Sequence, residues 1–383
     1  MTKKILTVAL AVSFFLFFSI STAVATDLEE TKIPDELTPG LDYLLTLVSP
    51  DNTDTFDLQR VEKVLDFVLA PKNDSVLFYA EKKDGANSAY YEFNIQKDLN
   101  HILEYTYNSE IPATVVMPSA VRLSYWSEVN GTQQPLPRLW TLPPESSSPV
   151  IVRGVEHIEI TPDQSSGAYY SYDMNKVLIL CKYRGRNLLI QIDKQKDMSD
   201  VGKKGLILGQ DEDWDYFYSG EKGISKTGLG WVDSYMYDSF GVSVFYEADD
   251  KTPVVRCGSF KWLRAGWSNM NFVNNHHIYN GMVRYAKGFK AILENPSLPA
   301  QPELAGMCSQ LEALSLDDLR EKVKPYLKTL ENRLSDENSS DEAFTELLKN
   351  GEYLAQLTRR EMEAMLVLEY MKSVLGKDQR FGG

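Results

Sequence analysis

The feature that most constrains the fold is a long succession of strand-type segments between residues 150 and 263. These segments are rich in β-branched and aromatic residues, and they follow one another across short turns without intervening helical patterns. The clearest pair is 177–183 and 187–192, joined by Arg184-Gly185-Arg186. Strands connected in this way pair with their neighbours, so we expect a largely antiparallel sheet. The other segments of this type are 150–160, 214–218, 232–237, 242–247 and 254–263.

The same sheet extends toward the N-terminus in the prediction. Segments 75–80 and 88–95 flank Asp84-Gly85, which is a hairpin signal, and a further strand is expected over 115–126 before the turn at Asn130-Gly131. Helical spacing predicts helices over 41–48 and 58–70, and a short helix over 98–107. Residues 26–38 are charged and contain proline, so we expect an irregular lead segment there.

A long amphipathic helix is expected after the last strand, with Asn274 or Asn275 as its N-cap. Gly281 and Gly288 lie on a flank of its apolar stripe, where glycine lowers helix stability, so we expect both to permit a close approach to the sheet. The spacing of the stripe predicts that this helix packs along one face of the sheet. The stripe consists of Ile278, Met282, Tyr285, Phe289 and Ile292.

The proline-rich segment 295–302 is the best linker in the chain, and everything after it has helical spacing. We expect an antiparallel helical hairpin over 303–376, with its last helix running from about 341 to 375. The apolar stripe of the hairpin either packs on the main domain, which we favour, or docks a partner or a second copy of the chain. The fold class is therefore α+β: an antiparallel sheet domain over 26–294 closed by a long helix, then the hairpin.

The first 25 residues have the pattern of a cleaved signal peptide. Lys3-Lys4 precede an apolar run over 5–20, and Ala23-Val24-Ala25 supplies the small residues before a cleavage site. The apolar run is shorter than the about 20 residues that a bilayer span needs, which disfavours the alternative of an uncleaved anchor. We therefore expect a secreted, periplasmic protein that does not span the membrane after cleavage.

Charge and cysteine content exclude several classes of protein. The chain has 54 acidic and 40 basic residues, and removal of Lys3 and Lys4 leaves 38 basic residues and a net charge of −16. Such a chain repels phosphate backbones, so nucleic acid is not an expected partner. Cys181, Cys257 and Cys308 form no metal-binding pattern. Pairing of Cys181 with Cys257 stays open, although three small buried residues is the favoured interpretation. We expect no cofactor and no metal.

The sequence offers few candidates for catalysis. The adjacent pair His276-His277 lacks the spacing that two metal-binding histidines need on a helix, so a polar helix start is the favoured interpretation. Aromatic and acidic residues alternate over 211–238, as in Asp213-Trp214-Asp215 and near Trp231. This pattern suits sugars or a loosely built calcium site, but an ordinary pair of strands explains it better. If the protein is an enzyme, Asp213, Asp215 and His277 are the first residues to test.

The order of elements over 58–294 resembles that of START-type helix-grip domains. The stretch Ser259-Phe260-Lys261-Trp262-Leu263 is similar to the Pro-Lys-Trp-Leu segment before the final helix of that family, with Phe260 in place of the proline. The resemblance implies a curved sheet around the helix, with an apolar cavity for a lipid or another hydrophobic ligand between them. It also implies that Met282, Tyr285 and Phe289 face the ligand, with Gly281 and Gly288 leaving room.

Three functional hypotheses follow from the sequence. The first is a non-catalytic protein that binds a small apolar or amphipathic ligand, or a protein partner, with Met282, Tyr285, Phe289, Trp214 and Trp231 as candidate contacts. The second is an enzyme that acts on an envelope glycan through carboxylates of the 211–238 stretch. The third is a structural protein that oligomerises through the hairpin. A closed apolar cavity, an open acidic cleft and an exposed apolar stripe on the hairpin, respectively, distinguish them.

Overall fold

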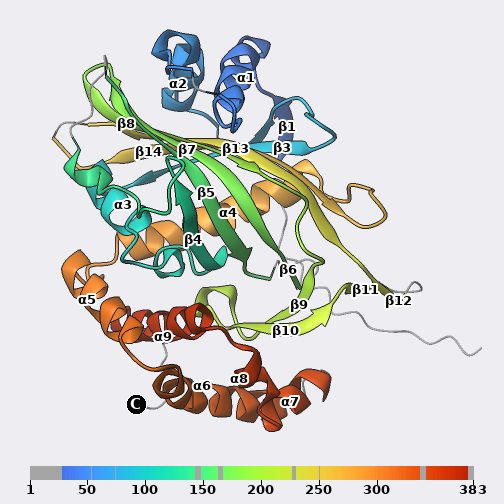
Figure 1. Cartoon of the computed structure of the whole chain (residues 1–383). Helices are drawn as coiled ribbons and strands as arrows, with labels where there is room; N and C mark the ends of the chain where they lie inside the picture. The colour runs from blue at the N-terminus through green and yellow to red at the C-terminus, as the bar shows by residue number, and fades with distance from the viewer. Residues whose placement is uncertain are drawn as a thin grey trace, which may run out of the picture.

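The computed structural model describes residues 28–52, 54–73, 75–142, 148–162, 167–226, 230–249, 251–336 and 342–377. The signal-peptide prediction over 1–25 lies outside these residues. The protein is of mixed α+β class, and a nine-stranded sheet forms its centre (Figure 1). In spatial order its strands are β1 (Glu29–Lys32), β2 (Val76–Tyr79), β3 (Asn87–Ile95), β14 (Val255–Gly266), β13 (Tyr235–Glu247), β8 (Arg186–Gln195), β7 (Ser171–Tyr183), β5 (Val150–Ile160) and β4 (Val121–Val129).

All neighbours in this sheet are antiparallel except β1 and β2, which are parallel. The expectation of an irregular segment over 26–38 is therefore wrong in part, because Glu29–Lys32 adds an edge strand to β2. The sequence prediction missed this strand because most of its residues are charged, and a short edge strand needs few apolar residues. A smaller sheet contains β6 (Ala168–Tyr169), β9 (Lys203–Ile207) and β10 (Tyr216–Lys222). Another pairs β11 (Ile224–Lys226) with β12 (Gly230–Val232).

The predicted tight turns are confirmed. Arg184 and Gly185 both have positive φ, 50° and 79°, and connect β7 directly to β8. Asp84-Gly85 and Asn130-Gly131 show the same pair of left-handed residues, with φ between 49° and 79°. Two successive left-handed residues match the twist of a hairpin, and asparagine, aspartate and glycine adopt them at the lowest cost. Local sequence therefore determines these three turns.

Helices cover both faces of the large sheet (Figure 1). On one face, α1 (Thr38–Leu47) and α2 (Glu62–Leu69), preceded by a 3₁₀ turn over Leu58–Val61, bury the alternate residues Leu188, Ile190 and Ile192 of β8. On the other face lie α3 (Leu99–Thr106) and α4 (Asn275–Leu293), which packs against β2, β3 and β14. Strand segments covered on both faces are apolar throughout, as Val177–Cys181 of β7 and Leu188–Ile190 of β8 are. Short 3₁₀ turns also occur at Asp35–Leu37, Ala113–Val115, Leu139–Thr141 and Asp211–Asp213.

The helix α4 begins as its sequence indicates, because the Asn274 side chain accepts a hydrogen bond from the backbone N–H of His277 at 2.9 Å. Its two glycines differ from the expectation of a close approach to the sheet. A Cβ at Gly281 would meet no atom within 4 Å, whereas one at Gly288 would lie 2.6 Å from the hydroxyl of Ser119, in the turn before β4. Gly281 therefore opens space beside α4, and Gly288 admits a neighbouring turn.

The C-terminal region contains α5 (Gln301–Glu312), α6 (Leu316–Asp336), α7 (Glu342–Lys349), α8 (Glu352–Gln356) and α9 (Arg359–Val374). The predicted single helix over 341–375 is wrong. Gly351 is left-handed, with φ of 76°, and the Thr358 hydroxyl caps α9 through the N–H of Glu361, so the chain restarts twice where a helix was expected to continue.

Candidate functional site

A cavity of about 600 Å³ lies between the large sheet and α4. Strands β3, β4, β5, β7, β8, β13 and β14 supply its floor, and the first half of α4 covers it. From α4, the lining includes Ile278, Gly281, Met282 and Tyr285, and His277 stands at its margin. A volume of this size is in the range of small-molecule sites, which are usually about 300–1,000 Å³. The cavity is therefore large enough for a ligand with several carbon atoms in a chain or ring.

Four charged residues cross the floor of the cavity. The strand registers place Lys176 of β7 opposite Asp193 of β8, Asp193 opposite Gly241 of β13, and Gly241 opposite Lys261 of β14. On β5, Gly154 lies opposite Lys176, and Glu156 lies two residues further along, opposite Met174. Because side chains on neighbouring strands at the same level share a face, the four charges form one row beneath the ligand space. We refer to Glu156, Lys176, Asp193 and Lys261 as the charged row.

The signs in the charged row alternate, and its members pair with one another. Lys176 donates to Glu156, and the Nζ of Lys261 donates to Asp193 Oδ1 at 2.9 Å. Glu156, Lys176 and Asp193 are buried. Burial opposes ionisation of Asp193, but the charges of Lys261 and Lys176 outweigh it, so the pKa of Asp193 lies below its ordinary value. The row thus carries two positive charges balanced by the two carboxylates.

Gly241 makes the pairing of Lys261 with Asp193 possible across an intervening strand. A Cβ at Gly241 would lie 2.8 Å from the carbonyl oxygen of Phe260 and 3.2 Å from Cδ of Lys261. With no side chain at this position, the Lys261 stem lies over β13 and reaches β8. The glycine is required here by a close approach rather than by its backbone angles.

A second set of polar groups adjoins the charged row on the side of α3. Gln191 lies opposite Ser243, Ser243 lies opposite Ser259, and the two serine hydroxyls are 2.8 Å apart. The Tyr107 hydroxyl, at the end of α3, donates to Gln191 Oε1 at 2.5 Å. Thr106 also lines the cavity, and its buried Oγ1 has no hydrogen-bond partner among the described residues. A buried hydroxyl without a partner costs free energy, so this end of the cavity suits a polar group of a ligand.

The opposite end of the cavity is mainly apolar. Beyond the charged row, the lining changes to Ile158, Ile160, Tyr170, Met236, Leu263, Ala265 and Trp267, which lie in or next to the ends of β5, β7, β13 and β14 nearer the N-terminus of α4. The hydroxyl-bearing residues Ser124, Ser234 and Ser239 also line this end. Phe272, in the loop between β14 and α4, lines the cavity and is 44% exposed, and Met270 in the same loop is 51% exposed. His277 and Gly281 are exposed as well. The cavity therefore reaches the surface beside the start of α4.

The structure separates the three α4 residues that the sequence analysis grouped. Met282 and Tyr285 line the cavity, whereas Phe289 is fully buried in the core beyond it and lies outside the lining. Tyr285 also stacks on Phe289, with ring centroids 5.2 Å apart. Burial is the main cause that raises the pKa of Tyr285, with Cys257 and Asp193 adding to it. This hydroxyl therefore stays protonated next to the charged row.

The carboxylates at the start of the 211–238 stretch lie outside the cavity, whereas Ile224, Ser234 and Met236 of the same stretch line it. Asp211 accepts from the Arg284 guanidinium at 2.7–3.0 Å, Asp213 accepts from the N–H of Gln210 at 3.0 Å, and Asp215 is buried in an ion pair with Lys372 at 2.8 Å. The Trp214 side chain is buried in the core with α9 and is not part of the cavity lining. The Trp231 side chain lies outside the described residues. These carboxylates therefore serve as ion-pair and capping partners.

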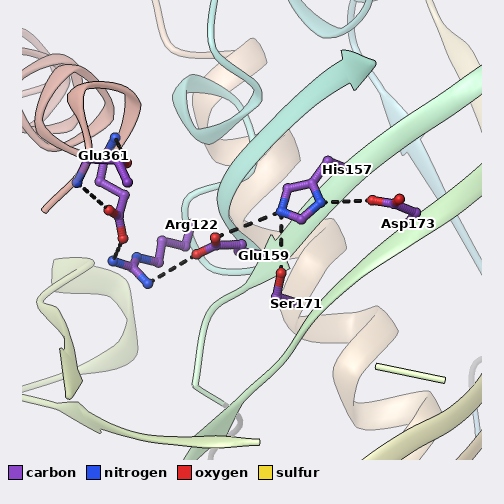
Figure 2. Close-up of polar contacts among 7 residues, drawn as sticks. Arg122, His157, Glu159, Ser171, Asp173 and Glu361 are labelled. Atoms are coloured by element: carbon purple, nitrogen blue, oxygen red, sulfur yellow. Dashed lines mark hydrogen bonds and ion pairs between the residues drawn. The ribbon is translucent and has the colours of Figure 1, made fainter. Parts of the chain in front are cut away.

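A separate polar cluster occupies the other face of β5 and β7. Figure 2 shows His157 between Asp173 and Ser171, with Nδ1 2.8 Å from Asp173 Oδ1 and Nε2 3.3 Å from Ser171 Oγ. These distances resemble those of a hydrolytic Ser–His–Asp triad. However, Glu159 also faces Nε2 at 3.8 Å, and its hydrogen bond is the leading cause that raises the pKa of His157. Carboxylates beside both ring nitrogens favour the charged form of the imidazole, whereas a general base acts in its neutral form.

The His157 cluster instead joins the sheet to the C-terminal helices. Arg122 of β4 donates to Glu159 at 3.1 Å and also to Glu361, near the start of α9 (Figure 2). The Arg122 side chain is 10% exposed. Its desolvation opposes the charge of the guanidinium, but the carboxylates, Glu361 foremost, outweigh this and raise its pKa. The sequence analysis missed both this cluster and the charged row, because their members lie on different strands and no local pattern links them.

The three cysteines are free and buried, as the favoured interpretation expected, and burial raises the pKa of Cys181 and of Cys308 to about 12. In the part of the chain that the structure describes, no group of three or more His, Cys, Asp or Glu residues is placed to hold a metal ion. Among the same residues, no helix has both the length and the apolar character to cross a bilayer. Comparison with family models, curated proteins and solved structures finds no match to this chain.

Proposed function

We propose that this protein is a non-catalytic carrier that binds one small amphipathic molecule in the cavity between the sheet and α4. The observation that carries the proposal is the cavity itself: about 600 Å³, largely apolar, and open at the surface beside the first turns of α4. Close packing normally removes such a volume from a protein interior, so a cavity of this size with convergent polar groups favours a binding role. In this proposal α4 closes the sheet as the helix of a helix-grip fold does.

The other two hypotheses have less support. A glycan-acting enzyme needs two carboxylates facing an open cleft, yet Asp211 and Asp215 are held by Arg284 and Lys372. An assembly role for the C-terminal region needs an exposed apolar stripe, yet Leu319, Val323 and Leu330 are buried against α7, α8 and α9. Both observations favour the ligand-binding proposal.

Native mass spectrometry of the mature protein purified from its own host tests the proposal. A complex with one retained amphipathic molecule, lost on denaturation, is the expected result. If the native ligand is lost during purification, the protein is titrated with the apolar fluorescent probe N-phenyl-1-naphthylamine instead. Saturation at one probe per chain is then the expected result. A protein that carries no ligand and leaves the probe fluorescence unchanged would refute the cavity as a binding site.

Export to the periplasm is part of the same proposal, and it rests on the sequence of residues 1–25. The intact mass of the cell-purified protein tests it directly. A chain that begins at Thr26 in the periplasmic fraction is expected. A chain that retains Lys3 and Lys4 would contradict export by cleavage.

A further inference from the structure

We infer that the charged row selects a ligand whose polar head is zwitterionic. The head enters the cavity first and lies at its inner end, and the hydrocarbon tail points toward the opening beside α4. The inference rests on the proposed function and adds the chemical class of the ligand and its orientation. It follows from the balance of charges in the row, from the distribution of polar and apolar residues along the strands, and from the flexible Lys261 stem above Gly241.

The balance of charges argues for a head without net charge. Glu156 and Asp193 offset Lys176 and Lys261, and the burial of three of these groups removes most of their contact with bulk water. An ion that entered with one net charge would leave an unbalanced charge in the cavity, which is unfavourable where water is largely excluded. A zwitterion adds an ammonium and an anion together, and the balance is kept.

The alternation of signs also favours a zwitterion over an uncharged polar head. Each ammonium has three N–H donors, so a lysine that donates to one carboxylate keeps the capacity to donate to an anionic group of a ligand. Asp193 and Glu156 can likewise accept from a cationic group, since a carboxylate has about four acceptor sites. Neighbouring strands lie about 5 Å apart, so the row offers charges of both signs within the span of one head group.

The orientation follows from the distribution of polar and apolar residues. Gln191, Ser243, Ser259 and Thr106 lie on the α3 side of the charged row. The lining on the other side is mainly apolar up to Trp267 and Phe272, and its polar members beyond the row include Ser124, Ser234 and Ser239. Tyr107 and the core around α3 close the polar end. A head at that end satisfies the buried Oγ1 of Thr106, and a tail then covers the apolar half.

The stem of Lys261 fills the space directly above Gly241. The Lys261 side chain crosses this position and is 31% exposed, so it is the one member of the row that is not deeply buried. Movement of this flexible stem changes the space over Gly241 without moving a strand. Lys261 and Asp193 are therefore the specificity-determining pair in this inference.

The experiment compares ligands that share a twelve-carbon chain and differ in the head. Dodecylphosphocholine, dodecanoate, dodecyltrimethylammonium and 1-monododecanoylglycerol, each below its micelle concentration, compete with N-phenyl-1-naphthylamine for the mature protein. Dodecylphosphocholine is expected to bind about 10-fold or more tightly than the other three, which corresponds to about 1.4 kcal/mol. Equal or tighter binding of the anion, the cation or the uncharged glyceride would overturn the inference.

Two variants change the balance of the row in opposite directions. Lys261→Met leaves one excess negative charge and is expected to shift the preference toward dodecyltrimethylammonium, whereas Asp193→Asn leaves one excess positive charge and shifts it toward dodecanoate. Lys63→Met, at an exposed ion pair with Glu36 outside the cavity, makes the same change in net charge and is the matched control. If Asp193→Asn does not fold, Lys261→Met alone decides the question.

The outcomes separate this inference from the proposed function. An unchanged order of heads in Lys261→Met, with the apolar probe still bound, would refute the role of the charged row and leave the cavity as a binding site. A wild-type protein that binds neither the probe nor any twelve-carbon ligand would refute both. A change of preference in Lys63→Met equal to that in Lys261→Met would assign the effect to overall charge and overturn the inference.

Discussion

Substitutions at Gly281 test the cavity most directly, because this position affects the stability of α4 and the space for the ligand in separable ways. A Cβ at Gly281 would meet no atom within 4 Å, so alanine adds no clash. Alanine in a helix interior is about 0.8–1 kcal/mol more favourable than glycine. Gly281→Ala is therefore expected to raise the free energy of unfolding by about 1 kcal/mol, measured by urea denaturation without ligand. Gly306 of α5 is the control, since a Cβ there also meets no atom within 4 Å.

A larger side chain at the same position is expected to block the cavity. A ligand present at 100 times its Kd stabilises the native state by about 2.7 kcal/mol. Gly281→Phe should lose this increment with N-phenyl-1-naphthylamine as the ligand, while Gly306→Phe, on an exposed part of α5, should keep it. The reasoning is refuted if Gly281→Ala is destabilising, because the position would then be filled, or if Gly281→Phe retains the full increment.

Three further predictions follow from the packing and the charges. Phe289→Ala is expected to cost about 3–5 kcal/mol of unfolding free energy because it empties a fully buried site, whereas Met282→Ala should weaken probe binding with a smaller loss of stability; equal losses in urea denaturation would contradict the distinction between core and cavity. Lys372→Met should cost about 3–5 kcal/mol, since it leaves a buried carboxylate without its cation, and the double variant with Asp215→Asn should recover part of it; additive losses would contradict the pairing. The pKa of His157 is raised in the folded state. Its contribution to stability is therefore complete below the ordinary histidine pKa of about 6.5 and is lost as pH rises through the folded value. The difference in unfolding free energy between wild type and His157→Gln, measured by urea denaturation across this range, should shrink with rising pH, and a difference that grows would refute the assignment.

Much of the secondary structure was predictable because it depends on neighbours in the chain. Glycine after asparagine, aspartate or arginine determined the hairpin turns, and Asn274 determined the start of α4. The prediction failed where local pattern and tertiary context disagree. The stretch over 341–375 has helical spacing throughout, but Gly351 and Thr358 interrupt it to fold α7, α8 and α9 against α6.

The sequence by itself determined the strand-rich centre, the amphipathic helix α4 and the acidic balance of the chain, since periodicity and composition are local properties. Only the tertiary structure decided which side chains meet. Asp193 and Lys261 are 68 residues apart, and the register of β8, β13 and β14 brings them to 2.9 Å. A shift of that register by one residue would turn the charges to the opposite face, where α1 and α2 pack. The site therefore depends on long-range strand pairing, which no local pattern in the chain encodes.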